Sequence, residues 1–430
     1  MPPTTILRTL WRKQRNVMNA MGPGLITGAA DDDPSGIATY SQAGASFGYT
    51  LGWSIVLALP FMVAVQQISA RLGRVTGHGL GYALRRHAPR WLLIAMVAML
   101  AVANTLNLAA DIGAMGATLH LLLDGHGIFG AHAWTVYVAI ICVAAEIWMV
   151  YYRYVALLKF LTLSLLSYIA LLFVVHVDWA ALFVGAFVPH MDITRDAALT
   201  LVAVLGTTIS PYLFFWQASE EAEDEGQEAD TRPLRVHIKD APGQMRRIQI
   251  DTWLGMAFSN VVALAILAGC AATLHIHGVT TIDTPDQAAQ ALAPIAGPFA
   301  RAVFAVGIIG TGLLAIPTLA GSLAYAIGEA LGWRTGLAKR PTEAPAFYAV
   351  IAGTTALGVL IVFSPLSPMR ALFWAAVVNG VAATPMIVCM VVLGSSSLVM
   401  GKLTLPAWLR WLGWIAAILM GAATIAMLVL

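Results

Sequence analysis

Long apolar segments separated by short polar ones run through almost the whole chain. Eleven of these segments are near the roughly 20 residues that a helix needs to cross a bilayer. This pattern predicts an all-α integral membrane protein with about eleven transmembrane helices. The expected limits are 21–47, 50–70, 91–123, 133–152, 156–176, 197–219, 250–274, 298–330, 345–364, 369–393 and 408–429.

Two of the apolar segments carry an internal proline in a polar setting. The first contains Asp33-Pro34 and the sixth contains Ser210-Pro211. Proline lacks a backbone donor, so we expect a helix break at Pro34 and another at Pro211. Five spans separate the two breaks, an odd number that places the two halves in opposite orientations. Matching broken helices in inverted halves are typical of a transporter with a binding site at the midplane.

Composition and charge agree with a membrane protein and orient it. The chain is 59% hydrophobic and 11% charged, whereas soluble domains have about 25% charged residues. If the N-terminus is cytosolic, 21 of the 24 lysines and arginines fall on the cytosolic side, and only Arg195, Arg301 and Arg370 do not. The positive-inside rule therefore predicts a cytosolic N-terminus and an external C-terminus, in what we expect to be a bacterial inner membrane.

This topology divides the chain into three parts. We expect a cytosolic arm at 1–20, a transporter core at 21–393 with two repeats of five helices, and a linker with the last helix at 394–430. Cys142, Cys270 and Cys389 each lie in an apolar segment, which does not suggest a disulfide framework. The sequence predicts no cofactor and no nucleic-acid partner.

Asp33 is the strongest candidate for a functional residue. Asp31, Asp32 and Asp33 are consecutive in an otherwise membrane-like segment. A carboxylate at mid-bilayer depth costs several kcal/mol unless it is paired, hydrated or bound to a cation. Neighbouring residues of a helix point about 100° apart, so the three cannot all face one ion. We interpret Asp33, beside the break, as a cation ligand; the alternative is a cap for the second half-helix.

Several short motifs resemble one protein family. Gly22-Pro23-Gly24, Asp33-Pro34 and Phe47-Gly48-Tyr49 are similar to the first helix of the natural resistance-associated macrophage protein (NRAMP) family of divalent-metal transporters. The stretch from Gln67 to Gly77 resembles the end of the second helix of that family. The resemblance covers about residues 20–395 and implies a LeuT-like fold, with broken helices one and six and a metal cation as substrate.

The chain departs from the family at the residues that such a fold places around the metal. The family usually has Asp-Pro-Gly-Asn in helix one, where this chain has Gly36 in place of the asparagine. The family usually has Met-Pro-His in helix six, where this chain has Ser210 and Tyr212. In helix three, the acidic positions linked to proton movement fall on Asn107 and Ala110.

These differences change the expected chemistry of the site. Oxygen ligands favour Mg²⁺, Ca²⁺ and Mn²⁺, whereas a methionine thioether favours softer metals. We expect an all-oxygen site with room for the waters that Mg²⁺ retains. Its candidate residues are Asp33, Ser210, Tyr212, Gly36, an amide at Asn379 and backbone carbonyls near Ala30 and Thr207. Ser210 can instead relieve the break at Pro211, Tyr212 can be a packing aromatic, and Asn379 can bond between helices.

Proton coupling is expected to be weak or absent. A phenol has an unperturbed pKa of about 10, so Tyr212 cannot carry protons near neutral pH as a histidine does. Asp31, Asp32 and Asp111 are the remaining candidates for a proton or ion path. The acidic run between Glu220 and Asp230 is expected to be a solvated cytosolic loop.

The sequence therefore predicts a membrane transporter of a hard or hydrated divalent cation, and not an enzyme. Two alternatives remain. One is a protein of the same fold that has lost metal transport and acts as a sensor or scaffold, or carries another substrate such as an organic cation. The other is an intramembrane aspartyl protease using Asp33 and Asp111, although the chain has no Gly-x-Gly-Asp motif.

Overall fold

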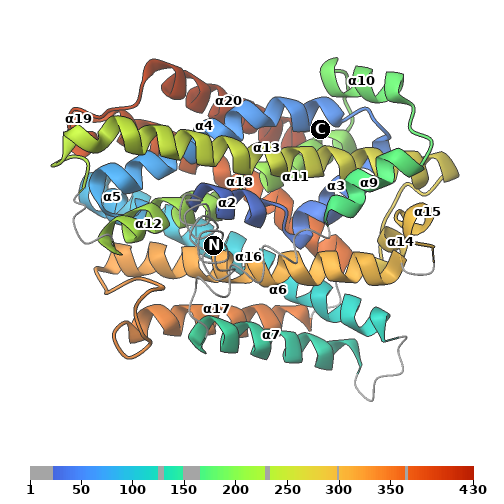
Figure 1. The fold of residues 1–430 in the computed structure, drawn as a ribbon, viewed down its shortest axis with the longest axis horizontal. Coiled ribbons are helices and arrows are strands. Elements are labelled where there is room, and N and C mark those ends of the chain that lie inside the picture. Colours follow the sequence, from blue (N-terminus) through green and yellow to red (C-terminus); the bar gives the residue numbers. More distant parts are fainter. Residues whose placement is uncertain (1–22, 124–129, 149–164, 228–232, 298–299, 364–366) are drawn as a thin grey trace, which may run out of the picture.

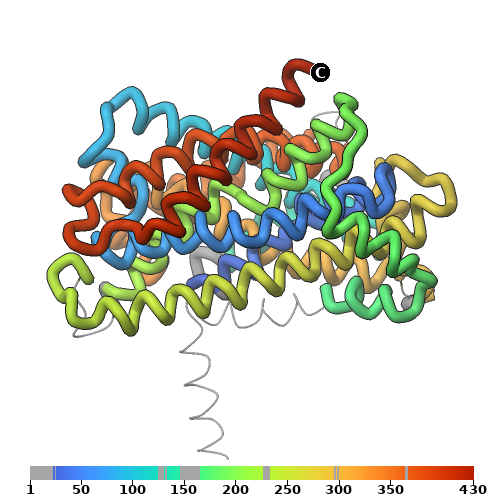
Figure 2. Tube along the Cα trace, turned by 90° about the horizontal axis from the view of Figure 1, so that it is seen from above, coloured from blue at the N-terminus to red at the C-terminus, as the bar shows by residue number. Residues whose placement is uncertain are grey.

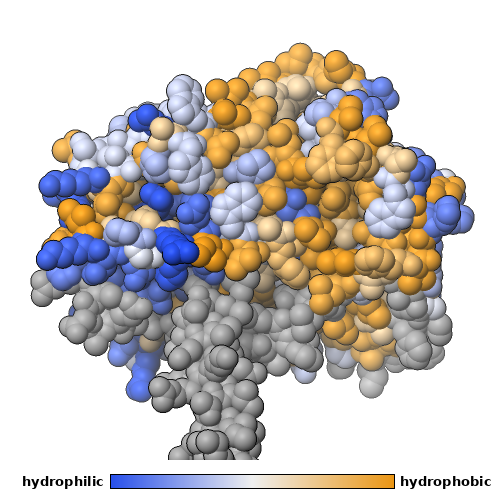
Figure 3. Space-filling view, turned by 45° about the horizontal axis from the view of Figure 1, so that its top comes forward, coloured by the Kyte–Doolittle hydropathy of each residue, from blue (hydrophilic) through white to orange (hydrophobic). Residues whose placement is uncertain are grey.

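The computed structural model describes residues 23–123, 130–148, 165–227, 233–297, 300–363 and 367–430. Within these ranges the chain is helical and forms no strand. The long helices run roughly along one common direction (Figures 1 and 2). Eight of the described helices are long and apolar enough to cross a membrane. The face in Figure 3 is largely apolar between a hydrophilic left end and a few hydrophilic residues at the right edge.

Both expected helix breaks are present. The first segment consists of α2 (Pro23–Asp31) and α3 (Pro34–Phe47), and the sixth of α11 (Arg195–Thr208) and α12 (Pro211–Gln227). In each case two residues separate the halves, and a proline begins the second half. The first residue of a helix has no intrahelical acceptor for its N–H, so the missing N–H of proline costs no hydrogen bond there. Asp33 has an extended backbone and caps α3, since its side chain accepts a hydrogen bond from Gly36 N.

The other predicted spans match single long helices or parts of them. They are α4 (Gly52–Thr76), α6 (Arg90–Leu122), α7 (Ala131–Trp148), α9 (Leu166–Val174), α13 (Ala241–Thr273), α16 (Ala300–Leu331), α17 (Pro345–Val362), α18 (Pro368–Ser395) and α20 (Ala407–Val429). The beginning of the fifth span and the arm at 1–20 lie outside the described residues. The number of transmembrane helices therefore stays a prediction.

Short helices connect these spans. α5 (Leu80–His87) and α19 (Ser397–Met400) lie at the left end in Figure 1. α10 (Trp179–Phe187), α14 (Pro285–Gln290) and α15 (Ala293–Ala296) lie at the right end. The 3₁₀ turns η2 (Ile238–Asp240) and η3 (His275–His277) flank α13. The N-cap residue before α5 is Gly79, which has no side chain to cap the helix. Glu329 of α16 supplies the cap by accepting from Tyr82 N at 3.1 Å.

Glycines let the broken first helix pack directly on α13. A Cβ at Gly28 would lie 2.3 Å from the Gly255 carbonyl carbon, and one at Gly44 would lie 2.2 Å from the Leu267 oxygen. Such contacts between small residues are the usual way in which membrane helices approach closely. They hold Asp31 and Asp32 against Ser259 of α13.

We expect Gly28→Ala to destabilise the fold strongly, because the added methyl would meet backbone atoms that cannot move cheaply. Overpacking of this kind costs about 3 kcal/mol, which should lower the melting temperature in detergent by roughly 5 °C or more. Gly353→Ala on α17 is the matched control, since no atom lies within 4 Å of that added Cβ. Equal melting temperatures for the two variants would contradict this packing.

Candidate functional site

The two helix breaks meet in the middle of the bundle. The Tyr212 hydroxyl, on the first turn of α12, donates to the Ala30 carbonyl at 2.9 Å. A Cβ at Gly36 would lie 3.2 Å from the Thr207 hydroxyl oxygen. Each half of one broken helix therefore contacts the other broken helix, and the non-helical residues of both face the same region.

Asp33 is the carboxylate at this meeting point. Its Oδ1 accepts from Ser35 Oγ at 2.6 Å and from Gly36 N at 2.7 Å. Its Oδ2 accepts from Asn107 Nδ2 at 2.9 Å and from the Tyr212 hydroxyl at 3.3 Å. Only 1% of Asp33 is exposed. Four donors thus compensate the carboxylate in place of water, which is how a protein keeps a buried charge.

Asp31 and Asp32 face away from this point. Both contact the Ser259 hydroxyl on α13, at 2.7 Å from Asp31 Oδ2 and 3.1 Å from Asp32 Oδ1. Each is buried and keeps one carboxylate oxygen without a hydrogen-bond partner. The backbone explains the split, because α2 ends at Asp31 and the extended conformation of Asp33 turns its side chain away from Ser259 and towards α3, where it accepts from Gly36 N.

Asn107 and Asp111 bring α6 to the site. They are four residues apart, so they lie on one face of the helix. Asp111 is fully buried, neither of its oxygens has a hydrogen-bond partner, and it is near enough to Asp33 to interact electrostatically. α6 therefore offers an amide in contact with Asp33 and a second carboxyl group one turn further along.

The remaining candidates are buried around the second break. The Ser210 hydroxyl donates to the carbonyls of Gly206 at 2.9 Å and Thr207 at 3.0 Å, so it satisfies the end of α11. Asn379 on α18 is fully buried, and neither atom of its amide has a partner. Its neighbour Gly380 touches Gly206, since a Cβ at Gly206 would lie 2.4 Å from Gly380 N.

The acidic groups do not converge on a single point. No group of three or more histidine, cysteine, aspartate or glutamate side chains able to hold a metal ion occurs in the described part of the chain. Any cation bound here would therefore depend on one carboxylate with neutral oxygen ligands. That composition suits a cation that keeps part of its water shell.

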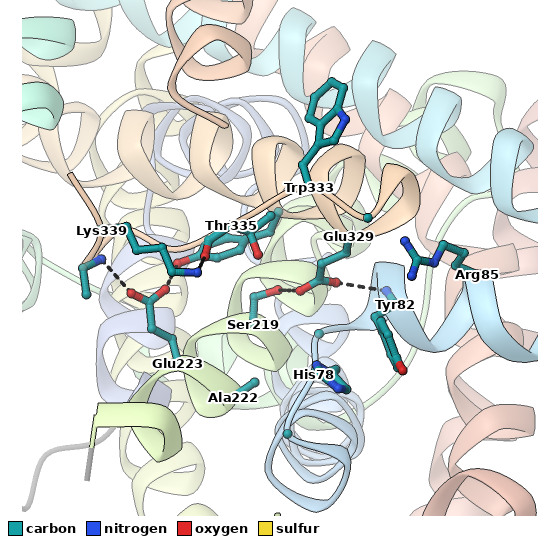
Figure 4. A pocket seen from close by; sticks show the side chains of 15 residues that line it. His78, Tyr82, Arg85, Ser219, Ala222, Glu223, Glu329, Trp333, Thr335 and Lys339 are labelled. Atoms are coloured by element: carbon teal, nitrogen blue, oxygen red, sulfur yellow. Dashed lines mark hydrogen bonds between the residues drawn. The ribbon is translucent and has the colours of Figure 1, made fainter. Parts of the chain in front are cut away.

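One cavity lies beyond each end of the site. A cavity of about 730 Å³ lies on the side of α10 and α14. It is lined by Ala38 and Gln42 of α3, Thr200 of α11 and Arg370 of α18, among others. A second cavity of about 490 Å³ lies at the other end, between α5, α12 and the end of α16 (Figure 4). Asp33 is buried and lines neither cavity.

The prediction of a solvated acidic loop after helix six is wrong for the part that the structure describes, and Glu228 and Asp230 lie outside the described residues. α12 continues as a helix to Gln227, and Glu220, Glu221 and Glu225 are buried in it. Glu221 forms an ion pair with Arg247. The Tyr325 hydroxyl donates to Glu220 at 3.2 Å. These contacts come from other helices, so a charge run in the sequence does not reveal them.

A buried polar site between two broken helices of an all-helical membrane protein defines a transporter of the LeuT-like fold. The solved structures agree on the fold. A manganese transporter from Eremococcus coleocola, bound to an aromatic bis-isothiourea compound, superposes with a TM-score of 0.75 at 17% identity, over 97% of this chain and 86% of that one. Mhp1, a nucleobase-cation-symport-1 transporter, gives 0.55 at 12% identity, over 95% and 91%. A Na⁺-coupled sialic acid symporter gives 0.53 at 14% identity, over 96% and 91%.

The family follows from the sequence match. The model of the natural resistance-associated macrophage protein-like family matches residues 24–430, so the chain belongs to that family. Its members are membrane transporters of metal ions, which confirms the resemblance predicted from the sequence motifs. Membership also confirms the expectation that the protein is not an enzyme and removes the aspartyl protease alternative.

Proposed function

We propose that the protein carries a hard or hydrated divalent cation, such as Mg²⁺ or Mn²⁺, across the membrane by alternating access, with Asp33 as the charged ligand. The observation that carries the proposal is a buried carboxylate at the meeting of two helix breaks, surrounded only by hydroxyl, amide and backbone groups. The structural similarity to a manganese transporter supports a divalent ion.

We assign the neutral ligands from the contacts around Asp33. The Tyr212 hydroxyl and the Ala30 carbonyl lie together beside Oδ2. The Asn107 amide also contacts Oδ2, and its own oxygen has no partner. Asn107 therefore supplies from α6 the side-chain amide that Gly36 lacks in helix one. Thr207 and Ser210 complete an oxygen-only set, with Asn379 as a further amide.

An oxygen-only set decides the kind of ion. Hydroxyl and amide oxygens bind soft cations weakly, whereas they are suitable ligands for Mg²⁺ and Mn²⁺. The cation would keep part of its water shell, as Mg²⁺ does when few carboxylates bind it. The manganese transporter is named for one ion of this kind, and the absence of a thioether at position 210 extends the proposal towards Mg²⁺.

We also propose the orientation and the parts of the transporter. The basic side chains at the ends of α4 and α5 lie at the same end of the molecule as α19, and the C-terminus marked in Figure 1 lies towards the other end. The positive-inside rule then places α5 in the cytosol and the C-terminus outside. The inverted repeats occupy 21–393, followed by a linker and helix at 394–430, in a bacterial inner membrane.

Cation uptake is expected to move few protons. The groups in contact with Asp33 are Asn107, Tyr212, Ser35 and a backbone N–H, none of which changes charge near pH 7. Internal pH, followed with a trapped dye during Mn²⁺ uptake into proteoliposomes, should stay close to that of protein-free liposomes. Metal-dependent acidification would mean that Asp31, Asp32 or Asp111 carries protons, and Asp111→Asn would then identify the carrier.

Metal-stimulated quenching of a dye inside proteoliposomes tests the proposed function. Mn²⁺ should enter vesicles that contain the protein faster than protein-free vesicles, and excess Mg²⁺ should slow this entry. A sensor or scaffold of the same fold would bind Mn²⁺ in a calorimeter without any uptake. That outcome would replace the proposal with the sensor alternative.

A further inference from the structure

One face of α12 connects the candidate site to the cavity at the cytosolic end. Tyr212, Trp216, Ser219 and Glu223 are spaced by four, three and four residues, so they lie along one stripe of the helix. Tyr212 contacts Asp33, whereas Ser219 and Glu223 line the cavity. The stripe spans about 16 Å at 1.5 Å per residue. Trp216 is therefore the residue between the cation ligand and the cavity.

Trp216 fills the space between α12 and α16. It is the largest of the fully buried side chains in the described ranges. A Cβ at Gly321 of α16 would lie 2.8 Å from Trp216 Cζ3, so the indole rests directly on the α16 backbone. One turn further along α16, Tyr325 meets the indole edge-on, with ring centroids 6.3 Å apart. Any side chain larger than glycine at position 321 would displace the indole.

The cavity beyond Trp216 is polar. Figure 4 shows Ser219, Glu223 and Glu329 in its wall, with Ser219 donating to Glu329 at 3.1 Å. The Tyr325 hydroxyl donates to Glu223, and the backbone N–H groups of Leu337 and Ala338 donate to the same carboxylate at 3.1 and 2.6 Å. These contacts attach the second half of helix six to the end of α16 and to the loop that follows it.

Ion pairs attach the same part of α12 on its other sides. Arg247 at the start of α13 pairs with Glu221, and Arg74 near the end of α4 pairs with Asp224 at 3.5 Å. α12 is thus fixed to three helices just past Trp216. These contacts close the path from Asp33 to the cytosolic cavity.

We propose that Trp216 is the inner gate of the transporter, and that its withdrawal from Gly321 opens Asp33 to the cytosolic cavity, through which the cation leaves. This inference rests on the proposed function for the identity of the cation. The gate itself depends only on how Trp216 packs against Gly321, whichever ion is carried. The role of Trp216 is to block the path.

Cysteine accessibility tests the gate without any transported ion. Cys142, Cys270 and Cys389 are first replaced by alanine, and Thr207→Cys is introduced as a reporter on the site side of Trp216. A membrane-impermeant thiol reagent is then applied to inside-out and right-side-out vesicles. Trp216→Ala should raise the labelling rate from the cytosolic side about tenfold or more, which corresponds to about 1.4 kcal/mol on the opening equilibrium. Trp216→Phe, which keeps a ring in place, should restore slow labelling.

The control reporter is Thr200→Cys, two turns away on α11 in the outer cavity. Its labelling from outside should not change with Trp216→Ala. Unchanged cytosolic labelling of Thr207→Cys would overturn the gate, and so would faster labelling of both reporters, because that would reflect general loosening. If Trp216→Ala is not monodisperse after purification, Trp216→Leu replaces it under the same criteria. If Thr207→Cys labels as expected but the unsubstituted protein takes up no metal, the proposed substrate is refuted and the gate is retained.

Discussion

Replacing Asp33 with asparagine is expected to abolish cation uptake while the protein stays folded. Four donors compensate the carboxylate in the structure, and an asparagine oxygen can still accept from Gly36 N and Ser35 Oγ. The charge, however, is lost. Placing a carboxylate at mid-membrane depth costs about 3 kcal/mol, and we expect the attraction to the divalent cation to be at least as large. Removing that attraction should lower the uptake rate about 100-fold or more. Initial rates of Mn²⁺ and Mg²⁺ entry into proteoliposomes provide the measurement.

Two matched variants make this result specific to Asp33. Asp240→Asn makes the same chemical change on the exposed turn before α13 and should leave uptake at the parent rate. Asp32→Asn makes the same chemical change at the residue next to Asp33, whose side chain faces Ser259. It should reduce uptake far less than Asp33→Asn. If Asp32→Asn were the more damaging change, the cation site would lie on the α13 side of helix one.

Ser210→Met should change the selectivity of the transporter towards soft ions. The serine hydroxyl donates to the carbonyls of Gly206 and Thr207 and makes no hydrogen bond to Asp33, and we expect the longer methionine side chain to reach towards Asp33. A thioether adds the one ligand type that favours softer transition metals. We expect the affinity for Cd²⁺ to rise about tenfold, a gain of about 1.4 kcal/mol, while that for Mg²⁺ falls.

Calorimetric titration of the purified protein with Cd²⁺ and Mg²⁺ would report both changes. Ser210→Ala is the control, because it removes the hydroxyl without adding sulfur and should leave Cd²⁺ affinity at the parent level. The oxygen-only site would be refuted if the parent bound Cd²⁺ at micromolar concentration and Ser210→Met bound it no more tightly.

Local chemistry explains which features of the fold were predictable. A proline that follows a polar residue in a long apolar segment, as in Asp33-Pro34 and Ser210-Pro211, predicted both interruptions. Proline alone does not decide a break, since Pro60, Pro317 and Pro385 lie inside continuous helices. The long apolar segments likewise determined where helices run. These features depend on residues close together in the chain, and the structure confirms them.

Contacts between distant segments explain what was missed. The sequence identified three consecutive aspartates, but only the packing of α2 against Ser259 shows that Asp31 and Asp32 turn away from the break. The contact between Asn107 and Asp33 joins residues 74 positions apart. Its sequence signal was the resemblance of helix three to the family, in which Asn107 stands at a position linked to proton movement. In the same way, the sequence of the acidic end of α12 predicts a solvated segment, because the ion pairs with Arg74 and Arg247 join residues that are distant in the chain.

The selectivity of uptake tests the central claim most directly. Proteoliposomes would be supplied with Mg²⁺, Mn²⁺, Ca²⁺ and Cd²⁺ in turn at two external pH values. For each ion, the initial rate of uptake by the parent protein would be compared with the rate by the Asp33→Asn variant. The account predicts that Mg²⁺ and Mn²⁺ enter, that Cd²⁺ is not preferred, that external pH changes the rates little, and that Asp33→Asn removes all uptake. Preferential Cd²⁺ entry, or Mg²⁺ and Mn²⁺ uptake that persists in Asp33→Asn, would contradict it.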